Sequence, residues 1–152
     1  MALREIKHYK KDGILRKKSR IADVIDDKLQ LLISDMIDTM YEADGVGLAA
    51  PQVGVLRRII VIDVGEGINV LINPEFVSQT GEEDDTEGCL SIPGIRGMVK
   101  RPAKVVVKAL NRNGKEIELK ANGLMARALC HEIDHLEGIL FTDKVIPGTL
   151  ED

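Results

Sequence analysis

Two stretches of the chain space their apolar residues three and four positions apart, which is the pattern of an amphipathic helix. The first covers residues 26–43 and has acidic residues at its start, where they favour the positive end of a helix. The second covers residues 122–137, with Asn122 as its N-cap and Gly138 placed to end it. The apolar positions of the first are Leu29, Leu32, Ile33, Met36, Ile37 and Met40.

Between these helices, short runs of apolar and β-branched residues alternate with glycine-containing turns, as in antiparallel strands. Asn113-Gly114 tolerates positive φ and therefore suits a tight hairpin turn. The order of helix, strands and helix predicts an α+β fold, with antiparallel sheets packed around the C-terminal helix and an amphipathic helix near the N-terminus. The predicted strands span residues 58–64, 69–73, 104–110 and 115–121.

The composition is that of an ordinary globular protein, and residues 1–152 are expected to form a single domain. Only 3% of the residues are aromatic, which argues against a surface that stacks nucleic-acid bases, and no DNA partner is expected. The longest strongly apolar run, residues 59–62, is too short to span a bilayer, and the charged N-terminus lacks the apolar segment of a secretory signal. The cytoplasm is the expected location, without a membrane partner.

Charge is distributed unevenly along the chain. The net charge is −4, but residues 1–20 carry +6 and the remainder carries −10. A basic segment of this kind can lie against a polyanion such as RNA. A solvated surface that maintains solubility explains the same charges and is the preferred interpretation.

The second predicted helix contains His131-Glu132-Ile133-Asp134-His135. The two histidines are four residues apart, so their imidazoles lie on one helical face and suit a single metal ion. Glu132 is displaced around the helix, from where it can reach a water on that metal without being a ligand. A surface helix that carries two histidines by chance is the alternative. The apolar flanks disfavour it, because polar groups on a buried helix need partners.

Three protein ligands are usual in a catalytic metal site, so a third must come from elsewhere. His8 is a candidate, but it lies in the basic N-terminal segment. Cys89 is the better candidate, in a short segment between the acidic residues 82–85 and a predicted turn at Pro93-Gly94. A neighbouring metal would lower the pKa of its thiol. Taken alone, Cys89 fits a small buried apolar residue equally well.

The chain contains two cysteines, Cys89 and Cys130, and both are expected to be free thiols. A single disulfide is rare in a chain without an export signal. Cys130 directly precedes His131, so on a helix its side chain points about 100° away from that imidazole. It is predicted to pack in the core.

Residues 45–52, GVGLAAPQ, nominally match a dinucleotide-binding fingerprint. That fingerprint must follow a strand and open a helix, whereas this one follows a helix and runs into Pro51, so the cofactor interpretation is rejected. What remains is a tight loop that presents Gln52 from apolar surroundings. An uncharged amide can stabilise developing negative charge. Taken alone, a purely structural turn is the simpler explanation.

Together the three segments closely resemble the signature motifs of the peptide deformylases, which remove the formyl group from N-formylmethionine on new bacterial polypeptides. The pattern G-x-G-x-A-A-x-Q matches residues 45–52, E-G-C-L-S matches residues 87–91, and H-E-x-D-H matches residues 131–135. One such match arises by chance fairly often, but three in order are highly specific. The similarity extends between the motifs over nearly the whole chain.

The resemblance implies an iron-dependent hydrolase acting on the formylmethionyl ends of nascent chains, with Zn²⁺, Ni²⁺ or Co²⁺ as substitutes for Fe²⁺. The donor types alone indicate only a borderline-soft transition metal. Formate and a free amino-terminal methionine are the expected products. The resemblance implies that Cys89, His131 and His135 hold the metal, that Glu132 is the general acid and base, and that the oxyanion is held by Gln52 and the N–H of Leu90.

The resemblance also implies an apolar pocket for the methionine side chain, formed by Val46, Gly47, Leu124 and the helix of His131. Arg96 is expected to contact the peptide beyond its first residue, although a solvated cation is the alternative. Few residues follow Pro147-Gly148, whereas many family members continue in a long helix associated with ribosome docking. Residues 1–20 could replace that helix in a transient ribosome contact.

Departures from the commonest family pattern are small. Cys130 stands where Gln is frequent, and Gly13 stands where Pro is frequent. Two other functions stay open. A zinc metallopeptidase shares the helical His-Glu-His arrangement, but its third ligand usually follows the helix, where only Glu137 and Glu151 are available. A non-catalytic member of the family would bind metal or peptide ends without turnover.

Overall fold

The computed structural model describes residues 2–152 and has an α+β fold, as predicted. Met1, the first residue of the basic segment and of the predicted domain, lies outside the described residues. The helices are α1 (Asp27–Glu42) and α2 (Gly123–Leu136), with short 3-10 helices η1 (Gly13–Arg16), η2 (Ala50–Val53) and η3 (Phe141–Asp143). The strands are β1 (Gly47–Ala49), β2 (Ile59–Ile62), β3 (Asn69–Thr80), β4 (Glu83–Cys89), β5 (Ile92–Arg101), β6 (Lys104–Leu110) and β7 (Glu116–Asn122).

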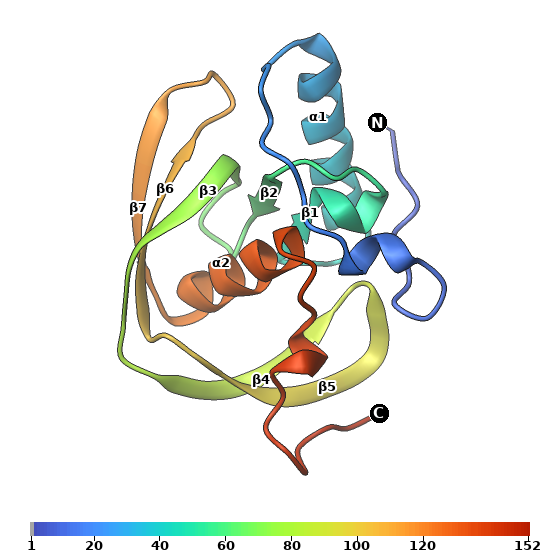
Figure 1. Ribbon diagram of the computed structural model, residues 1–152, viewed down its shortest axis with the longest axis vertical. Helices are drawn as coiled ribbons and strands as arrows, with labels where there is room; N and C mark the ends of the chain where they lie inside the picture. The colour runs from blue at the N-terminus through green and yellow to red at the C-terminus, as the bar shows by residue number, and fades with distance from the viewer. Residues whose placement is uncertain (1) are drawn as a thin grey trace.

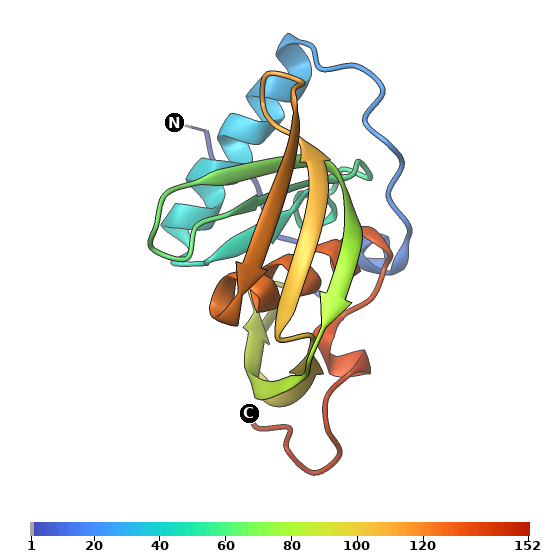
Figure 2. The same ribbon diagram turned by 90° about the vertical axis from the view of Figure 1, so that its left-hand side faces the viewer.

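The strands form two antiparallel sheets with α2 between them. Five strands pair in the order β1-β2-β3-β6-β7, and β4 pairs only with β5. Helix α2 runs through the centre of the molecule, with the larger sheet on one side and the curved β4–β5 hairpin on the other (Figure 1). A perpendicular view shows β3, β6 and β7 covering one flank of this helix (Figure 2). The side chains of the His-Glu-His motif on α2 therefore lie between the two sheets.

Helix α1 begins where the sequence predicts. The side chain of Asp26 accepts a hydrogen bond of 3.0 Å from the backbone N–H of Leu29, which satisfies one of the free donors of the first turn. Its apolar stripe packs on the outer face of the larger sheet, against Leu48, Ile59 and Val61. The positive φ of 56° at Asp44 then turns the chain toward β1.

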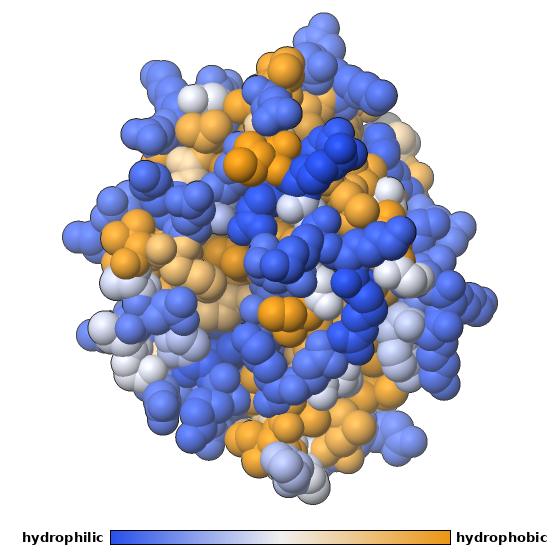
Figure 3. Space-filling model, in the orientation of Figure 1, coloured by the Kyte–Doolittle hydropathy of each residue, from blue (hydrophilic) through white to orange (hydrophobic). Residues whose placement is uncertain are grey.

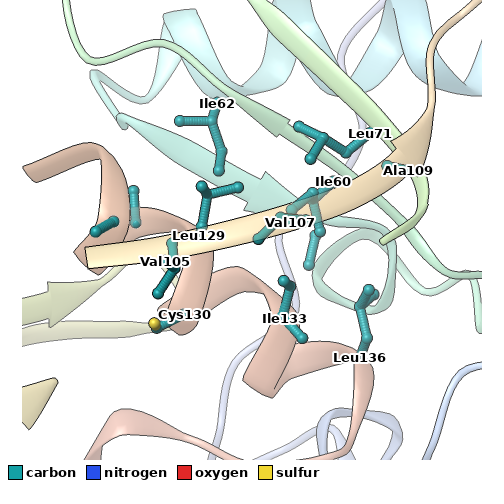
Figure 4. Packing of buried hydrophobic residues seen from close by; sticks show 13 residues of the cluster. Ile60, Ile62, Leu71, Val105, Val107, Ala109, Leu129, Cys130, Ile133 and Leu136 are labelled. Carbon is teal, nitrogen blue, oxygen red and sulfur yellow. The ribbon is translucent and has the colours of Figure 1, made fainter. Parts of the chain in front are cut away.

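Helix α2 is buried on most sides, as its sequence predicts. Its residues 126–133 are all buried, and so are His135 and Leu136. One face packs against β2, β3 and β6 through Leu129, Ile133 and Leu136 (Figure 4). Asn122 is the N-cap residue, but its side chain accepts no capping hydrogen bond within the helix. The helix is thus stabilised mainly by burial of its apolar side chains, about 25 cal/mol for each Å² of apolar surface.

The predicted turn at Pro93-Gly94 is wrong. Residues 83–101 form the β4–β5 hairpin, and Pro93 and Gly94 lie within β5. The hairpin turns instead between Cys89 and Ile92. Exposed acidic side chains mask the strand pattern in β4, whose interior residue is the buried Glu87. Proline is tolerated because β5 is an edge strand of a two-stranded sheet.

Strand β3 is longer than predicted and continues through Pro74 to Thr80. The pairing of β3 with β6 shifts register between Ile72 and Glu75, a β-bulge that accommodates the missing N–H of Pro74.

Polar side chains cover much of the face shown in Figure 3, with smaller apolar patches between them. Among the described residues, no helix combines the length and the apolar character needed to cross a membrane.

Candidate active site

Three side chains with metal-binding atoms converge between α2 and the β4–β5 hairpin. The sulfur of Cys89, at the end of β4, lies 3.3 Å from Nε2 of His135. The ligand atoms of Cys89, His131 and His135 all lie within 4.8 Å of one another. The imidazoles of His131 and His135 are one helical turn apart, with ring centroids separated by 5.0 Å. The third predicted ligand, Cys89, is therefore close to both histidines, and it is a free thiol.

The chemistry of this donor set fits a borderline-soft divalent transition metal. One thiol and two imidazoles provide the three ligands of an open site, and imidazole and thiolate suit iron, zinc, nickel and cobalt. Burial lowers the pKa of His135 well below its ordinary value, with the neighbouring His131 adding to the effect, so this ring is neutral and able to ligate. The site is therefore suited to a metal, although these donors discriminate poorly among the candidate ions.

The alternatives for the third ligand lie elsewhere. The Nδ1 atom of His8 accepts a hydrogen bond of 3.1 Å from the N–H of Lys10, and His8 is not part of the cluster. Glu137, the candidate of a metallopeptidase, accepts a hydrogen bond of 2.6 Å from Arg58. Cys130 packs in the core, as predicted, and burial raises the pKa of its thiol to about 11.

A buried carboxylate, Glu87, orients the first histidine of the cluster. Its Oε1 lies 2.9 Å from Nδ1 of His131. Since an ionised carboxylate only accepts hydrogen bonds, Nδ1 is the donor to Glu87, and Nε2 is the atom of His131 that can ligate a metal. Two guanidinium groups contact the same carboxylate: Arg101 donates two hydrogen bonds of 2.8 and 2.9 Å, and Arg127 donates one of 2.7 Å.

The arginines fix the charge of Glu87. Burial raises the pKa of this carboxyl, but the hydrogen bonds from Arg101 and His131 outweigh it and hold the pKa far below its ordinary value. Arg101 also donates a hydrogen bond of 2.6 Å to Asp134, which gives the aspartate of the helical motif a structural role. Sequence reasoning missed Glu87, Arg101 and Arg127 as site residues. The only sequence signal was the position of Glu87 two residues before Cys89.

Glu132 lies beside the cluster in a position to move protons. It is 4% exposed, and its Oε1 has no hydrogen-bond partner among the described residues. Burial raises the pKa of this carboxyl to about 7, with the charge of His131 opposing the shift. Its neighbour is Gly47, where an added Cβ atom would lie 2.6 Å from Oε2 of Glu132. A group with a pKa near neutrality can both accept and return a proton at physiological pH.

Gln52 presents an amide N–H group on the other side of the cluster. Its Oε1 accepts a hydrogen bond of 3.0 Å from the N–H of Ala49, so its Nε2 faces the cluster. Nε2 donates to the hydroxyl of Ser91 at 3.1 Å and lies 3.5 Å from the sulfur of Cys89. One of its two N–H bonds is thus engaged by Ser91, and the other points toward the cluster with only a weak sulfur acceptor.

All the predicted site residues except His135 line one cleft of about 700 Å³. His135 lies deeper, with 1% of its surface exposed. Val46 and Leu124 are 45% and 55% exposed and flank the cleft as apolar side chains. Arg96 and Glu151 also line the cleft, and two backbone hydrogen bonds join them. The remaining predicted lining residues are Gly47, Gln52, Cys89, Leu90, His131 and Glu132.

Known proteins resemble this chain over almost its whole length. A family model described as polypeptide deformylase matches residues 3–150. A peptide deformylase from Alkaliphilus metalliredigens is 64% identical over 135 residues, which are 89% of this chain and 92% of the relative. One from Caldicellulosiruptor bescii is 61% identical over 152 residues, which are 100% of this chain and 91% of the relative.

Solved structures agree with these matches. The crystal structure of peptide deformylase from Thermotoga maritima superposes with a TM-score of 0.94 at 40% identity, covering 97% of this chain and 100% of that one. A peptide deformylase from Legionella pneumophila gives a TM-score of 0.92 at 50% identity, covering 96% of this chain and 88% of that one. The similarity thus includes the fold as well as the sequence.

Proposed function

The chain belongs to the polypeptide deformylase family, metalloenzymes that remove the formyl group from N-formylmethionyl nascent polypeptides, and from that premise we propose which of its residues carry the reaction. Cys89, His131 and His135 hold one divalent metal. The observation that carries this assignment is the convergence of a thiol and two imidazoles within 4.8 Å, next to the partly unpartnered carboxylate of Glu132.

The metal held by these residues is Fe²⁺ in the cell, with Zn²⁺, Ni²⁺ or Co²⁺ as functional substitutes. When bound, it supplies a Lewis acid that lowers the pKa of a coordinated water toward about 7. Glu87 orients the ring of His131 for this ligation through Nδ1. The thiol and imidazole donors suit all four of these ions, and metal analysis of the purified protein identifies the one that is bound.

Glu132 moves the protons of the reaction. Its unpartnered Oε1 accepts a proton from the attacking water and then returns it to the nitrogen of the departing peptide. Gly47 leaves room for the carboxylate directly beside β1. The products are formate and a polypeptide with a free amino-terminal methionine.

Gln52 and the backbone N–H of Leu90 stabilise the negative charge that develops on the formyl oxygen. The second N–H bond of Gln52 Nε2 is available for this purpose, because the first is held by Ser91. A neutral amide suits the role, since it does not change protonation during the reaction.

The methionine side chain of the substrate occupies the apolar part of the cleft, beside Val46, Gly47 and Leu124. Arg96, which also lines the cleft, contacts the peptide beyond the first residue. A pocket of this kind selects a long unbranched apolar side chain and excludes a charged one.

The remaining assignments concern the chain as a whole: its domain extent, its location and its partners. We propose that residues 1–152 are one metallohydrolase domain that acts in the cytoplasm, without a DNA or membrane partner. The basic residues 10–20 support a transient contact with ribosomal RNA, because Lys10, Lys11, Lys17, Lys18 and Arg20 are all exposed. Charge reversal of Lys17 and Lys18 should weaken co-sedimentation with ribosomes, and unchanged co-sedimentation would remove this contact.

The central assignment is tested by anaerobic release of formate from formyl-Met-Ala-Ser, with elemental analysis of the same sample. Glu132→Gln should retain the metal and lose turnover, whereas Cys89→Ala should lose both. Near-normal turnover of Glu132→Gln would rule out its role in proton transfer. Cleavage of unformylated peptides at internal bonds would indicate the metallopeptidase instead, and a metal-loaded wild type without formate release would indicate a non-catalytic protein.

A further inference from the structure

We propose that the N-terminal residues 7–9 form a clamp that positions the two oxyanion-stabilising elements of the active site relative to each other. The inference rests on the proposed roles of Gln52 and Leu90. It assigns a function to the part of the basic N-terminal segment that faces the protein interior. Residues 7–9 are positioning residues, because they act through the backbone of the site and do not line the cleft.

Two backbone hydrogen bonds define the clamp. The N–H of Lys7 donates to the carbonyl oxygen of Gln52 at 2.7 Å, and the N–H of Tyr9 donates to the carbonyl oxygen of Ser91 at 3.0 Å. Gln52 provides one proposed oxyanion donor, and Ser91 directly follows Leu90, which provides the other. Two alternate N–H groups of one short segment thus bind one backbone carbonyl of each element.

The side chains of the clamp hold it in place on both sides. The Cε atom of Lys7 lies 3.1 Å from the position of a Cβ atom on Gly54, so the stem of Lys7 lies over the residue that ends η2. Tyr9 packs with Cys89 and Ile95 against the small buried cluster that contains Ile92 and Phe141. Each end of residues 7–9 is therefore anchored to the element whose carbonyl it binds.

Upstream residues attach the same segment to α1. The N–H of Arg4 donates to Oγ1 of Thr39 at 3.0 Å, and the side chain of Arg4 forms an ion pair of 3.0 Å with Asp35. Both α1 partners are buried. In Figure 1 the N-terminal segment of the chain descends beside α1 and η2 toward the hairpin of β4 and β5. The clamp thus has a fixed support from which to hold the site.

A clamp is needed because the two oxyanion elements come from different sheets. Gln52 follows β1 of the five-stranded sheet, whereas Leu90 and Ser91 join β4 to β5 in the separate hairpin. Their direct contacts are the side-chain bonds from Gln52 Nε2 to Ser91 and Cys89. Both bonds come from the side-chain amide of Gln52, so neither joins the backbones of the two elements. Displacement of a catalytic group by about 1 Å can reduce a rate 100-fold.

Proline substitutions remove the backbone N–H groups of Lys7 and Tyr9, and an alanine substitution measures the effect of losing a side chain alone. Lys7→Pro and Tyr9→Pro remove the clamp bonds, Lys7→Ala keeps the N–H of residue 7, and Glu5→Pro adds proline where no backbone hydrogen bond is found. Loaded with zinc, Lys7→Pro and Tyr9→Pro should lower kcat about 10- to 100-fold, with KM within about threefold and normal metal content. Glu5→Pro should stay close to the wild type. Lys7→Ala, which keeps the N–H and loses only the contact of its stem with Gly54, should keep kcat within about threefold of the wild type.

A readout independent of turnover accompanies the kinetics. In ¹⁵N-labelled zinc protein, the side-chain amide resonance of Gln52 should shift or broaden in Lys7→Pro and Tyr9→Pro, shift less in Lys7→Ala, and stay in place in Glu5→Pro. Folded clamp variants with unchanged kcat and an unmoved Gln52 resonance would overturn the clamp. An equal loss of kcat in Glu5→Pro would also overturn it, because proline in the segment would then act generally.

Hydrogen exchange in the wild type provides a test that does not depend on the folding of any variant. The amide protons of Lys7 and Tyr9 should exchange as slowly as those of the core strands, and that of Glu5 should exchange rapidly. Rapid exchange at Lys7 and Tyr9 would overturn the proposal. A wild type that releases no formate would refute the proposed function, while the Gln52 resonance and the exchange rates would still decide whether the clamp exists.

Discussion

Gly47 and Glu132 are in direct contact: a Cβ atom added to Gly47 would lie 2.6 Å from Oε2 of the glutamate and 3.0 Å from its Cγ. Strand β1 therefore approaches α2 so closely that a Cβ atom at this position would force the side chain of Glu132 to move. The first motif and the helical motif, which are far apart in the sequence, are thus two sides of one arrangement around the Glu132 carboxylate.

We expect Gly47→Ala to lower kcat about 10- to 100-fold while the metal stays bound, because the methyl group displaces the proton-transferring carboxylate. Overpacking should also cost about 1–3 kcal/mol of unfolding free energy. Formate-release kinetics, metal content and urea unfolding measure these effects. Gly13→Ala is the matched control, since a Cβ atom there has no neighbour within 4 Å. A wild-type kcat in Gly47→Ala would show that turnover does not depend on where the Glu132 carboxylate lies relative to Gly47.

The sulfur of Cys89 and Nε2 of His135, 3.3 Å apart, lead to a prediction about metal removal. A strong chelator should abolish formate release, and Fe²⁺, Ni²⁺, Co²⁺ or Zn²⁺ should restore it. In the metal-free protein, Cys89 should react with iodoacetamide, and bound metal should protect it. Cys130 should stay unreactive at pH 8 in both states, because it is buried and the pKa of its thiol is raised to about 11. Full activity after complete chelation would contradict this site.

For Gln52 we expect a defect in turnover and not in substrate binding. Gln52→Ala should lower kcat about 10²- to 10³-fold, which is the usual effect of losing one oxyanion donor, with little change in KM. Gln79→Ala, at an exposed position of β3, should behave as the wild type. A rise in KM with unchanged kcat in Gln52→Ala would assign this residue to ground-state binding instead.

The sequence predicted the parts of this fold that have strong local signals. The predicted bounds of α1, α2, β6 and β7 agree with the structure to within a residue or two, because apolar periodicity, Asp26 and Asn113-Gly114 act locally. The predicted site residues also lie together, since all of them except His135 line one cleft.

The sequence could not predict features that depend on distant partners. The β4–β5 hairpin was missed because successive acidic residues in β4 hide the alternation of polar and apolar positions that marks a strand. Glu87 is buried because Arg101 of β5 and Arg127 of α2 both donate hydrogen bonds to it. Nothing local marks a glutamate as the centre of a buried ion network. Similarly, the contacts of Lys7 and Tyr9 with the site arise from backbone groups, which no residue pattern reveals.

The buried carboxylate of Glu87 gives the last prediction, which concerns stability. Its oxygens accept three hydrogen bonds from the guanidinium groups of Arg101 and Arg127, and both arginines are buried. Glu87→Gln would leave Arg127 without its counter-charge and Arg101 with Asp134 alone. Breaking a buried ion pair in this way costs about 3–5 kcal/mol, so urea unfolding of the metal-free protein at pH 7 should show a loss of that size. The control, Glu83→Gln, changes an exposed carboxylate in the same strand and should alter stability by less than about 0.5 kcal/mol.

The pH dependence of this loss follows from the pKa of Glu87. Burial raises the pKa of this carboxyl, but the hydrogen bonds from Arg101 and His131 hold it well below its ordinary value in the folded protein. An unfolded glutamate has a pKa of about 4.3, so the carboxylate contributes fully above that pH and loses its contribution as the pH falls toward the lower folded pKa. The difference in unfolding free energy between wild type and Glu87→Gln should therefore shrink by up to about 1.4 kcal/mol per pH unit below pH 4. A difference that stays constant down to pH 3 would mean that Glu87 does not stabilise the fold through its charge.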